Sequence, residues 1–368
     1  MKKSEPSNNN GLDKINKTNE TYEIAMDEII NLKNISKILL NENKCLNCEK
    51  KSFIEIKKFK PLDEQLDLDN LDDNFGRCSC GKRHIDIVMA SILKIMKEEN
   101  IEFRRFILRN GPTPLLTPMF NNKNEPFIEK NSLIILHPKF TKNIAKRIMN
   151  EVSEVKGVIK GNSKDTVGLM DANSKVISYE LLAGSDIRCD IVQSPVGEIV
   201  INKIQHLSYL EFPPSMENKI KRLWEYIQTK QLSKEEISNL TAIDGTCGNG
   251  TLGIFLLKLG FKKVIFNDIW RPSTIMTSIN LNANGFPINK EIEYLKDGYN
   301  IDNITNVTDI NSIANGNNFE VYNLPFEELN EIFSNKTHDI CILDCFPGIN
   351  TDKLEKIAKS LAKDVLII

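Results

Sequence analysis

The stretch of sequence with the clearest chemical meaning is a glycine-rich turn, AIDGTCGNGT, at residues 242–251. It separates a short apolar run from an amphipathic one. Glycines let a ligand approach the backbone closely, and the first N–H groups of a following helix have no partner within that helix. The turn therefore predicts a binding site for a small ligand where a strand passes into a helix.

Two ligand classes fit this turn. The pattern Gly248-x-Gly250-x-x-Gly253 matches a dinucleotide fingerprint, with Asp268 near the usual acidic position, and would make the chain a nicotinamide-dependent oxidoreductase. Asp244, however, ends the strand four residues before Gly248, where its carboxylate would repel a pyrophosphate. A carboxylate there suits a ligand with an ammonium group and no phosphate, which favours S-adenosylmethionine.

The turn resembles the first motif of class I S-adenosylmethionine-dependent methyltransferases, Asp/Glu-x-Gly-x-Gly-x-Gly. Thr246 replaces the first of those glycines. The resemblance covers roughly residues 240–368, about a third of the chain. It implies a Rossmann-like methyltransferase sheet and S-adenosylmethionine as the cofactor.

The same resemblance implies roles for residues at the ends of the second and third strands. Asp268 would accept hydrogen bonds from both ribose hydroxyls. Ile269 would cover one face of the adenine, Asn323 would contact its amino edge, and Leu324 would contact the ring. The cofactor-binding residues expected in this way are Asp244, Thr246, Gly248, Gly250, Asp268, Ile269, Asn323 and Leu324.

A second, partial resemblance concerns the methyl acceptor. The segments 267–269 and 280–284 resemble archaeal and eukaryotic tRNA guanine-N2 methyltransferases, whose fourth-strand motif is Asp-Pro-Phe-Gly. Here that motif is DCFPG, residues 344–348. By this resemblance the chain is archaeal, Asp344 accepts the proton or the amine of the substrate, and Phe346 stacks on it.

RNA, and tRNA in particular, is therefore the favoured acceptor. A protein or a small molecule remains an alternative. In either case an in-line methyl transfer needs mainly proximity and orientation, with a carboxylate to accept the proton.

Four of the eight cysteines form an early cluster, Cys45-x-x-Cys48 and Cys78-x-Cys80, with 29 residues between the pairs. Four thiolates close a tetrahedral zinc site, so the cluster predicts structural zinc. His84 could replace one thiol. An iron–sulfur or redox role and unligated thiols are the alternatives.

Charge is unevenly distributed although the net charge is −2, from 48 basic and 50 acidic residues. Residues 101–240 carry a net +4 and residues 241–368 a net −5. A strongly basic, histone-like binder is excluded, and any nucleic-acid surface is expected before residue 240. The candidates for a basic patch are Lys82, Arg83, Arg104, Arg105 and Arg109.

A parallel sheet would bring the glycine-rich turn and the strand-end acids together. After Leu240, short apolar runs alternate with amphipathic ones, as in a doubly wound sheet. The expected strands are 241–244, 264–268, 319–323, 340–344 and 365–368. The expected helices are 251–259, 272–284, 326–333 and 351–362. The polar segment 298–318 is expected to be a loop.

The residues before 240 show a mixed pattern. The expected helices are 22–40, 84–97, 141–152 and 216–229. The expected strands are 133–136, 155–159, 176–182, 187–193 and 198–204. Residues 111–118 contain prolines and are expected to form a loop.

These elements predict an α/β chain whose Rossmann-like sheet follows an α+β domain and a small zinc-binding helical module. The expected domains are a disordered tail, 1–20, the zinc module, 21–110, a substrate-binding domain, 111–238, and the methyltransferase domain, 239–368. We further expect a cytoplasmic protein, because no apolar run is long enough for a membrane helix and no signal peptide is evident. A sheet that ends on its fifth strand would leave an open edge, which a homodimer could cover.

Overall fold

The computed structural model describes residues 24–41, 45, 47–48, 56–121, 126–169, 175–289, 312–333, 338–346 and 348–368. The expected tail, 1–20, and Pro347 lie outside these residues. Among the described residues, no helix is long and apolar enough to cross a membrane.

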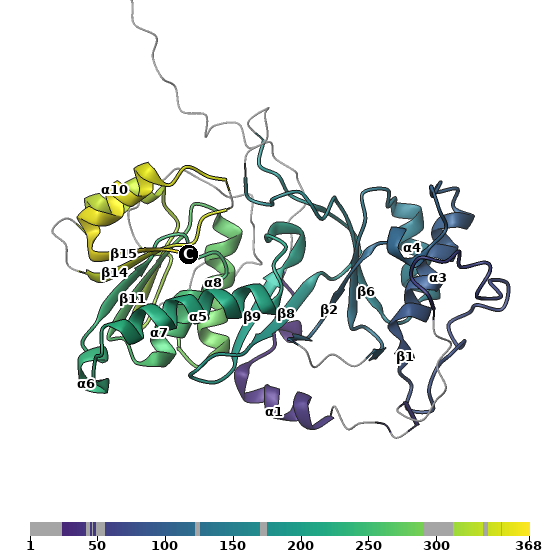
Figure 1. The fold of residues 1–368 in the computed structure, drawn as a ribbon, viewed down its shortest axis with the longest axis horizontal. Coiled ribbons are helices and arrows are strands. Elements are labelled where there is room, and N and C mark those ends of the chain that lie inside the picture. Colours follow the sequence, from purple (N-terminus) through teal and green to yellow (C-terminus); the bar gives the residue numbers. More distant parts are fainter. Residues whose placement is uncertain are drawn as a thin grey trace, which may run out of the picture.

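A six-stranded sheet occupies the C-terminal part of the chain (Figure 1). Its spatial order is β12-β13-β11-β10-β14-β15, and every neighbouring pair is parallel except β12 with β13. The strands are β10 (Thr241–Asp244), β11 (Lys263–Asn267), β12 (Ala314–Asn315), β13 (Phe319–Tyr322), β14 (His338–Leu343) and β15 (Ala362–Ile367). The order reverses between β10 and β14, which is where doubly wound sheets bind ligands.

Helices cover both faces of this sheet, because successive strand residues point to opposite sides. Ala242 packs in one core with α5 and α7, whereas Ile243 packs in another with α9 and α10. The helices are α5 (Pro213–Thr229), α6 (Lys234–Ile237), α7 (Thr251–Leu259), α8 (Arg271–Ala283), α9 (Leu329–Ile332), which follows the 3-10 turn η5 (Phe326–Glu328), and α10 (Asp352–Leu361). The fold is thus the expected α/β, Rossmann-like one.

Each strand and helix expected after residue 240 is present, with ends shifted by at most three residues. The expected loop 298–318 is wrong within 312–318, where β12 pairs with β13; the rest of it lies outside the described residues. Two residues are too few to show an alternating pattern in sequence.

Smaller sheets precede this one. One has the order β2-β5-β6-β7, another β3-β8-β9, and β1 pairs with β4. The strands are β1 (Arg83–His84), β2 (Thr113–Leu116), β3 (Met119–Phe120), β4 (Phe127–Ile128), β5 (Leu133–Leu136), β6 (Val155–Lys160), β7 (Glu180–Gly184), β8 (Ile187–Val192) and β9 (Ile199–Ile204).

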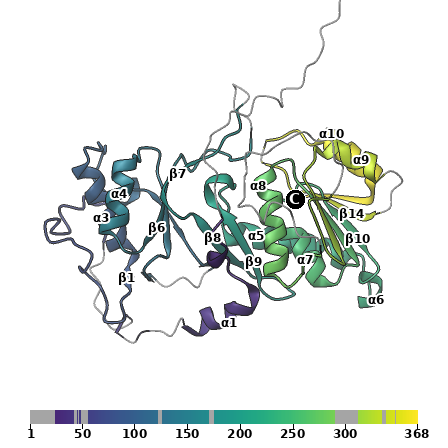
Figure 2. The same ribbon diagram turned by 180° about the vertical axis from the view of Figure 1, so that it is seen from behind.

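Helices α3 (Ile85–Glu98) and α4 (Lys142–Glu151) share one apolar core with β5 and β6 (Figure 2). The shorter elements are η1 (Met26–Glu28), α1 (Leu32–Asn41), η2 (Leu108–Asn110) and η3 (Gln205–Leu207). The expected domain boundaries remain a prediction.

Three expectations in this region need correction. The helix expected over 22–40 begins only at Leu32, because the Ile30 N–H instead donates to Asn202 Oδ1 at 3.0 Å. The loop expected over 111–118 contains β2, paired with β5. The strand expected over 176–182 starts four residues later, as β7.

Asn280 of α8 and Asn284, which caps its carboxyl end, cover the open edge of β9. The amide of Asn284 accepts from Val200 N at 3.0 Å and donates to Val200 O at 2.7 Å. The amide of Asn280 accepts from Asn202 N at 2.8 Å and donates to Asn202 O at 2.9 Å. It also donates to Asn249 O at 3.0 Å. Four helical residues rise about as far as two strand residues, so the two amides act as a further strand.

At the other sheet, β15 pairs with β14, and side chains of α5 reach it. Arg222 donates to Ile367 O at 3.3 Å, and Lys230 pairs with Asp364 at 2.8 Å. The homodimer that would cover this edge remains a prediction.

We predict that Asn280→Ala lowers the free energy of unfolding by about 3 kcal/mol, because the buried backbone groups of Asn202 and the half-buried carbonyl of Asn249 lose their partner. Urea denaturation measures this loss. Asn282→Ala, an exposed asparagine of the same helix, is the matched control and should change stability by less than about 0.5 kcal/mol. Equal losses would contradict the role of the amide.

Candidate active site

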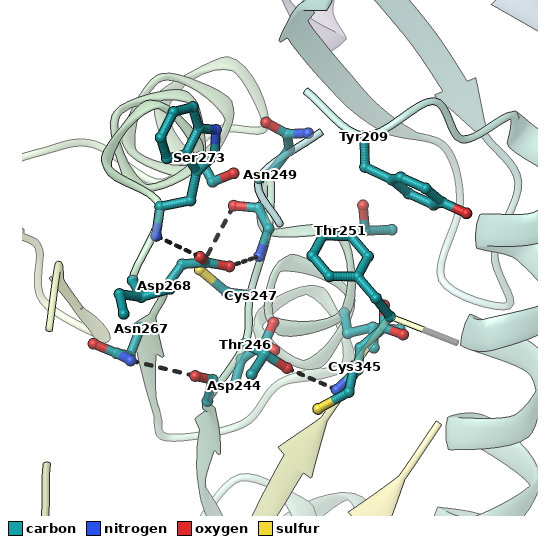
Figure 3. Close-up of a pocket in the computed structure, with 18 of the residues that line it drawn as sticks. Tyr209, Asp244, Thr246, Cys247, Asn249, Thr251, Asn267, Asp268, Ser273 and Cys345 are labelled. Carbon is teal, nitrogen blue, oxygen red and sulfur yellow. Dashed lines mark hydrogen bonds between the residues drawn. The ribbon is translucent and has the colours of Figure 1, made fainter. Parts of the chain in front are cut away.

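A cavity of about 340 Å³ opens at the carboxyl ends of β10, β11 and β14 (Figure 3). The sheet contributes the glycine-rich turn and the residues that follow β11 and β14. The elements before the sheet contribute a second wall, formed by residues 167–169, Lys203, Tyr209, Glu211, Met216 and Lys219. The site is therefore built from both halves of the chain.

The backbone of the glycine-rich turn needs its glycines for different reasons. Gly250 has a φ of +89°, and a Cβ there would meet Thr277 at 3.0 Å. Gly253, the third glycine of the dinucleotide-like pattern, packs against Phe266, which a Cβ would approach to 2.2 Å. That third glycine thus serves the packing of α7 on β11, a role that does not distinguish a dinucleotide from another ligand.

Asp244 is fully buried at the end of β10 and lines the cavity. Its Oδ2 accepts from Gly253 N at 2.8 Å, while its Oδ1 has no hydrogen-bond partner among the described residues. Burial raises the pKa of this carboxyl to about 7, and the nearby Asp344 and Asp268 add to the shift. A cationic group in the cavity would relieve both the missing partner and the repulsion.

Asp268, at the end of β11, also lines the cavity. It accepts from Trp270 N at 2.8 Å and from Gly248 N at 2.9 Å, so it ties the glycine-rich turn to the second strand. Burial raises its pKa to about 6, and Asp344 contributes. Each carboxylate oxygen keeps a second lone pair, as acceptance of two hydroxyls requires.

Asp344 follows β14 and is held by two contacts. Its backbone N–H donates to Thr246 Oγ1 at 2.8 Å, which explains a threonine at this place in the turn. Its carboxylate pairs with Lys219 at 2.6 Å, and Lys219 also pairs with Glu211 at 2.8 Å. Burial raises the pKa of Asp344, and the Lys219 ammonium opposes that shift.

Three aromatic rings line the cavity together with Asp344. Tyr209 and Phe346 meet edge to face with 5.2 Å between their centroids. Trp270 donates its indole N–H to Leu207 O at 2.7 Å, and Gly168 leaves space beside Phe346 and Trp270. Three rings, one of them next to a carboxylate, can hold a flat group that carries an N–H donor.

The other expected cofactor residues divide into two pairs. Gly248 and Ile269 line the cavity, and Ile269 is 60% exposed at its rim. Asn323 and Leu324 are not among the lining residues: the Asn323 amide donates to Asp268 O at 2.8 Å and Ile269 O at 3.0 Å, and Leu324 is buried. Their contact with adenine remains a prediction.

Sequence motifs did not reveal the second wall. Lys203 is the most informative of its residues, because it is a lone charge within the apolar strand IVINKI. Its ammonium pairs with Asp190 at 2.8 Å, and Arg188 pairs with the same carboxylate at 2.6 Å, all three side chains being almost fully buried. Two cations share one carboxylate, which leaves this buried group a net positive charge next to a cavity whose lining otherwise holds more acids than cations.

The four early cysteines lie together. Their sulfur atoms are all within 4.8 Å of one another, with Cys45 to Cys78 at 3.8 Å and Cys48 to Cys80 at 3.5 Å. These spacings suit a tetrahedral ion, for which metal–sulfur bonds of about 2.3 Å give sulfur–sulfur edges of about 3.8 Å. His84 is not part of this group; its Nδ1 accepts from Asp86 N and caps α3. The cluster could thus hold a metal with thiolates alone.

The later cysteines carry no comparable chemistry. Cys189, Cys247 and Cys341 are buried. Burial raises the pKa of the Cys345 thiol, and Asp344 adds to this. Cys345 lines the cavity as a thiol, not as an activated thiolate.

The expected basic patch is only partly on the surface. Arg83 is fully buried and pairs with Glu154 at 2.7 Å, so its place in the patch is wrong. Lys82 pairs with Glu129 at 3.3 Å. Arg104, Arg105 and Arg109 are exposed. The Arg83 guanidinium thus stabilises the fold through a buried ion pair and is not part of the surface.

No family model and no curated protein matches the chain. Solved structures do match. A tRNA m1G37 methyltransferase from M. jannaschii is 13% identical with a TM-score of 0.37, over 74% of this chain and 62% of that chain. Trm5b from Pyrococcus abyssi is 15% identical with a TM-score of 0.35, over 63% and 55%.

TYW2 from P. horikoshii, in complex with MeSAdo, is 14% identical with a TM-score of 0.38, over 74% of this chain and 76% of that chain. This chain spans less than two thirds of the M. jannaschii and P. abyssi proteins. Similarities this low transfer no ligand, so the site is interpreted from its own geometry.

We predict that Asp244 makes the ligand-free protein less stable as pH rises from about 4 to about 7. In this window the folded carboxyl keeps a proton that the unfolded one, with a pKa of about 3.9, has released. Asp244→Asn should therefore raise the free energy of unfolding above pH 7 by roughly 2–4 kcal/mol. Denaturant titrations at several pH values measure this.

The exposed loop residue Asp69 provides the control, and Asp69→Asn should leave the pH profile unchanged. An unchanged profile for Asp244→Asn would show that burial does not raise the pKa of the Asp244 carboxyl.

Proposed function

We propose that the chain is an S-adenosylmethionine-dependent methyltransferase that acts on RNA. One observation carries the cofactor: the unpartnered, buried oxygen of Asp244 and the unbalanced cation Lys203 line the same cavity. An amino acid carries an ammonium and a carboxylate, so a ligand with an amino-acid end would complement both charges.

The other residues of the site fit the rest of this ligand. Asp268 offers a carboxylate for a ribose diol, and Ile269 and Trp270 offer apolar surface for a base. A pyrophosphate would instead meet the carboxylates of Asp244, Asp268 and Asp344. These charges argue against the nicotinamide-dependent alternative.

Bound here, S-adenosylmethionine would supply a methyl group activated by its sulfonium. Tyr209 and Phe346 would orient a flat acceptor, as their edge-to-face arrangement leaves ring faces for stacking. Asp344 would accept the N–H of the attacking nitrogen and take its proton, and Lys219 would keep that carboxylate ionised until then. A nucleobase with an exocyclic amine combines the flat ring and the N–H donor that this pocket suits.

The first test measures ligand binding by calorimetry. The parent protein should bind S-adenosylmethionine and S-adenosylhomocysteine and should not bind NAD. Asp268→Ala should weaken binding about tenfold or more, because charge-assisted hydrogen bonds are lost. Asp344→Ala should leave this affinity within about twofold and reduce turnover, since Asp344 serves the acceptor. Binding of NAD alone would overturn the proposal.

The acceptor is tested by transfer of a labelled methyl group into fractionated cell extract. We expect the label in RNA. Label in protein or in small molecules would keep the methyltransferase and reject RNA as its acceptor.

We also propose that the four-cysteine cluster binds zinc in a structural role. A site closed by four thiolates leaves no position for a reacting water, so the metal would stabilise the surrounding fold and take no part in methyl transfer. Iron would also accept four thiolates, and the metal content distinguishes the two.

Elemental analysis of protein purified without chelators should give about one zinc per chain. Cys45→Ser should lower the zinc content and the melting temperature, whereas Cys189→Ser, a buried cysteine outside the cluster, should leave zinc unchanged. Metal-free parent protein, or iron in place of zinc, would reject the assignment.

A further inference from the structure

An exposed aromatic ring lies among cations at the surface near α3. The backbone of residues 57–60 runs beside that of residues 104–109: Arg109 N donates to Lys58 O at 3.3 Å, and Arg105 donates to Phe59 O at 3.2 Å. We call this region the Phe59 surface. Around Phe59 it presents the exposed cations Lys57, Lys58, Lys60, Arg104, Arg105 and Arg109.

Phe59 is unusual in being large, apolar and 63% exposed, the highest exposure among the exposed large hydrophobic residues of the structure. The Arg109 guanidinium lies 5.4 Å from the ring centroid, so the ring is held in place from one side. A ring displayed in this way is suited to stacking against another flat group.

In the described part of the chain, the six cations have no carboxylate within salt-bridge distance. Other exposed lysines do form such pairs; Lys97, close by, pairs with Asp63 at 3.3 Å. The repulsion among the six is therefore not balanced within the described part of the chain. A partner with several negative charges would balance it.

The position of the Phe59 surface narrows the kind of partner. It adjoins the end of α3, where Lys97 lies over the Phe106 ring at 4.4 Å. In both views α3 lies at the opposite end of the molecule from the sheet that holds the cavity (Figures 1 and 2). A small acceptor in the cavity cannot reach this surface, whereas a polymer can contact both.

We propose that the Phe59 surface binds a single-stranded stretch of the RNA substrate, with a base stacked on Phe59 and phosphates held by the surrounding cations. Stacking on an aromatic ring combined with a basic track is how proteins hold single strands without reading sequence. The proposal rests on the proposed function in taking RNA as the acceptor.

The test is fluorescence anisotropy of the full chain with a labelled single-stranded RNA of mixed sequence. Phe59→Leu, which keeps an apolar side chain and removes the ring, should weaken binding about tenfold, and Phe59→Tyr should leave it unchanged. Lys58→Ala with Lys60→Ala should weaken binding and lower the slope of log affinity against log salt by roughly 1.4, about 0.7 for each lost phosphate contact.

A matched double variant, Lys234→Ala with Lys262→Ala, removes two exposed lysines near the amino ends of β10 and β11, opposite the cavity. It should bind RNA like the parent. Equal RNA binding by all variants would overturn the proposal. Polyglutamate serves as a second probe: variants that lose polyglutamate binding and keep RNA binding would also overturn the proposal, because they would mark a surface for an acidic protein.

Calorimetry with S-adenosylmethionine on the same variants separates this proposal from the proposed function. Each variant should bind the cofactor like the parent. RNA binding that depends on Phe59 in a protein that binds no S-adenosylmethionine would retain the surface and reject the methyltransferase. Binding of S-adenosylmethionine together with RNA binding that does not depend on Phe59 would retain the methyltransferase and reject the Phe59 surface.

Discussion

Three carboxylates at the ends of neighbouring parallel strands, one buried and two half-buried, impose the main physical constraint on this molecule. Asp344 raises the pKa of both Asp244 and Asp268, Asp268 adds to the shift of Asp244, and loss of surrounding water raises the pKa of all three carboxyls. Backbone N–H groups of the glycine-rich turn and its helix compensate the first two, and the Lys219 ammonium compensates the third. The glycine-rich turn and helix α5, which carries Lys219, therefore lie where their N–H groups and ammonium stabilise these carboxylates. What remains uncompensated is one oxygen of Asp244, and that deficit defines the ligand.

The second constraint is the junction that brings the earlier elements to this sheet. The Asn280 amide bonds to β9 through Asn202 and to the glycine-rich turn through Asn249 O. Because Lys203 is the next residue of β9, the same junction sets a cation beside the cavity. A side-chain amide can do this where a further strand could not, since helix α8 must also pack against the sheet. The ligand site and the interface between the sheets therefore share the same residues of β9 and of the glycine-rich turn.

These constraints explain which features could be predicted from sequence. The strands and helices after residue 240 follow from apolar periodicity, and the glycines and acids at strand ends follow from the topology of a parallel sheet. The segment 280–284, in contrast, indicates only a family resemblance. The pairing of its Asn280 and Asn284 amides with β9 depends on contacts across about 80 residues, which no local pattern predicts. Arg83 was misplaced for the same reason: only the fold brings it to Glu154. Lys203, Lys219 and Tyr209 reach the cavity from elements whose sequence gives no sign of it, apart from the charge inside an apolar strand.

The position of Lys219 bears on how an acceptor could reach Asp344. An ammonium paired with a single carboxylate would have to leave it, and desolvation would make that separation costly. Lys219 instead lies between Asp344 and Glu211, at 2.6 and 2.8 Å, and both contacts raise its pKa against the opposing effect of burial. When an N–H of the acceptor hydrogen-bonds to Asp344, Lys219 can keep its contact with Glu211, so the ammonium is not left without a carboxylate partner. In the proposed reaction Glu211 thus keeps the second cation of the site paired while Asp344 exchanges one donor for another, which is why a residue outside any motif belongs to the wall of this cavity.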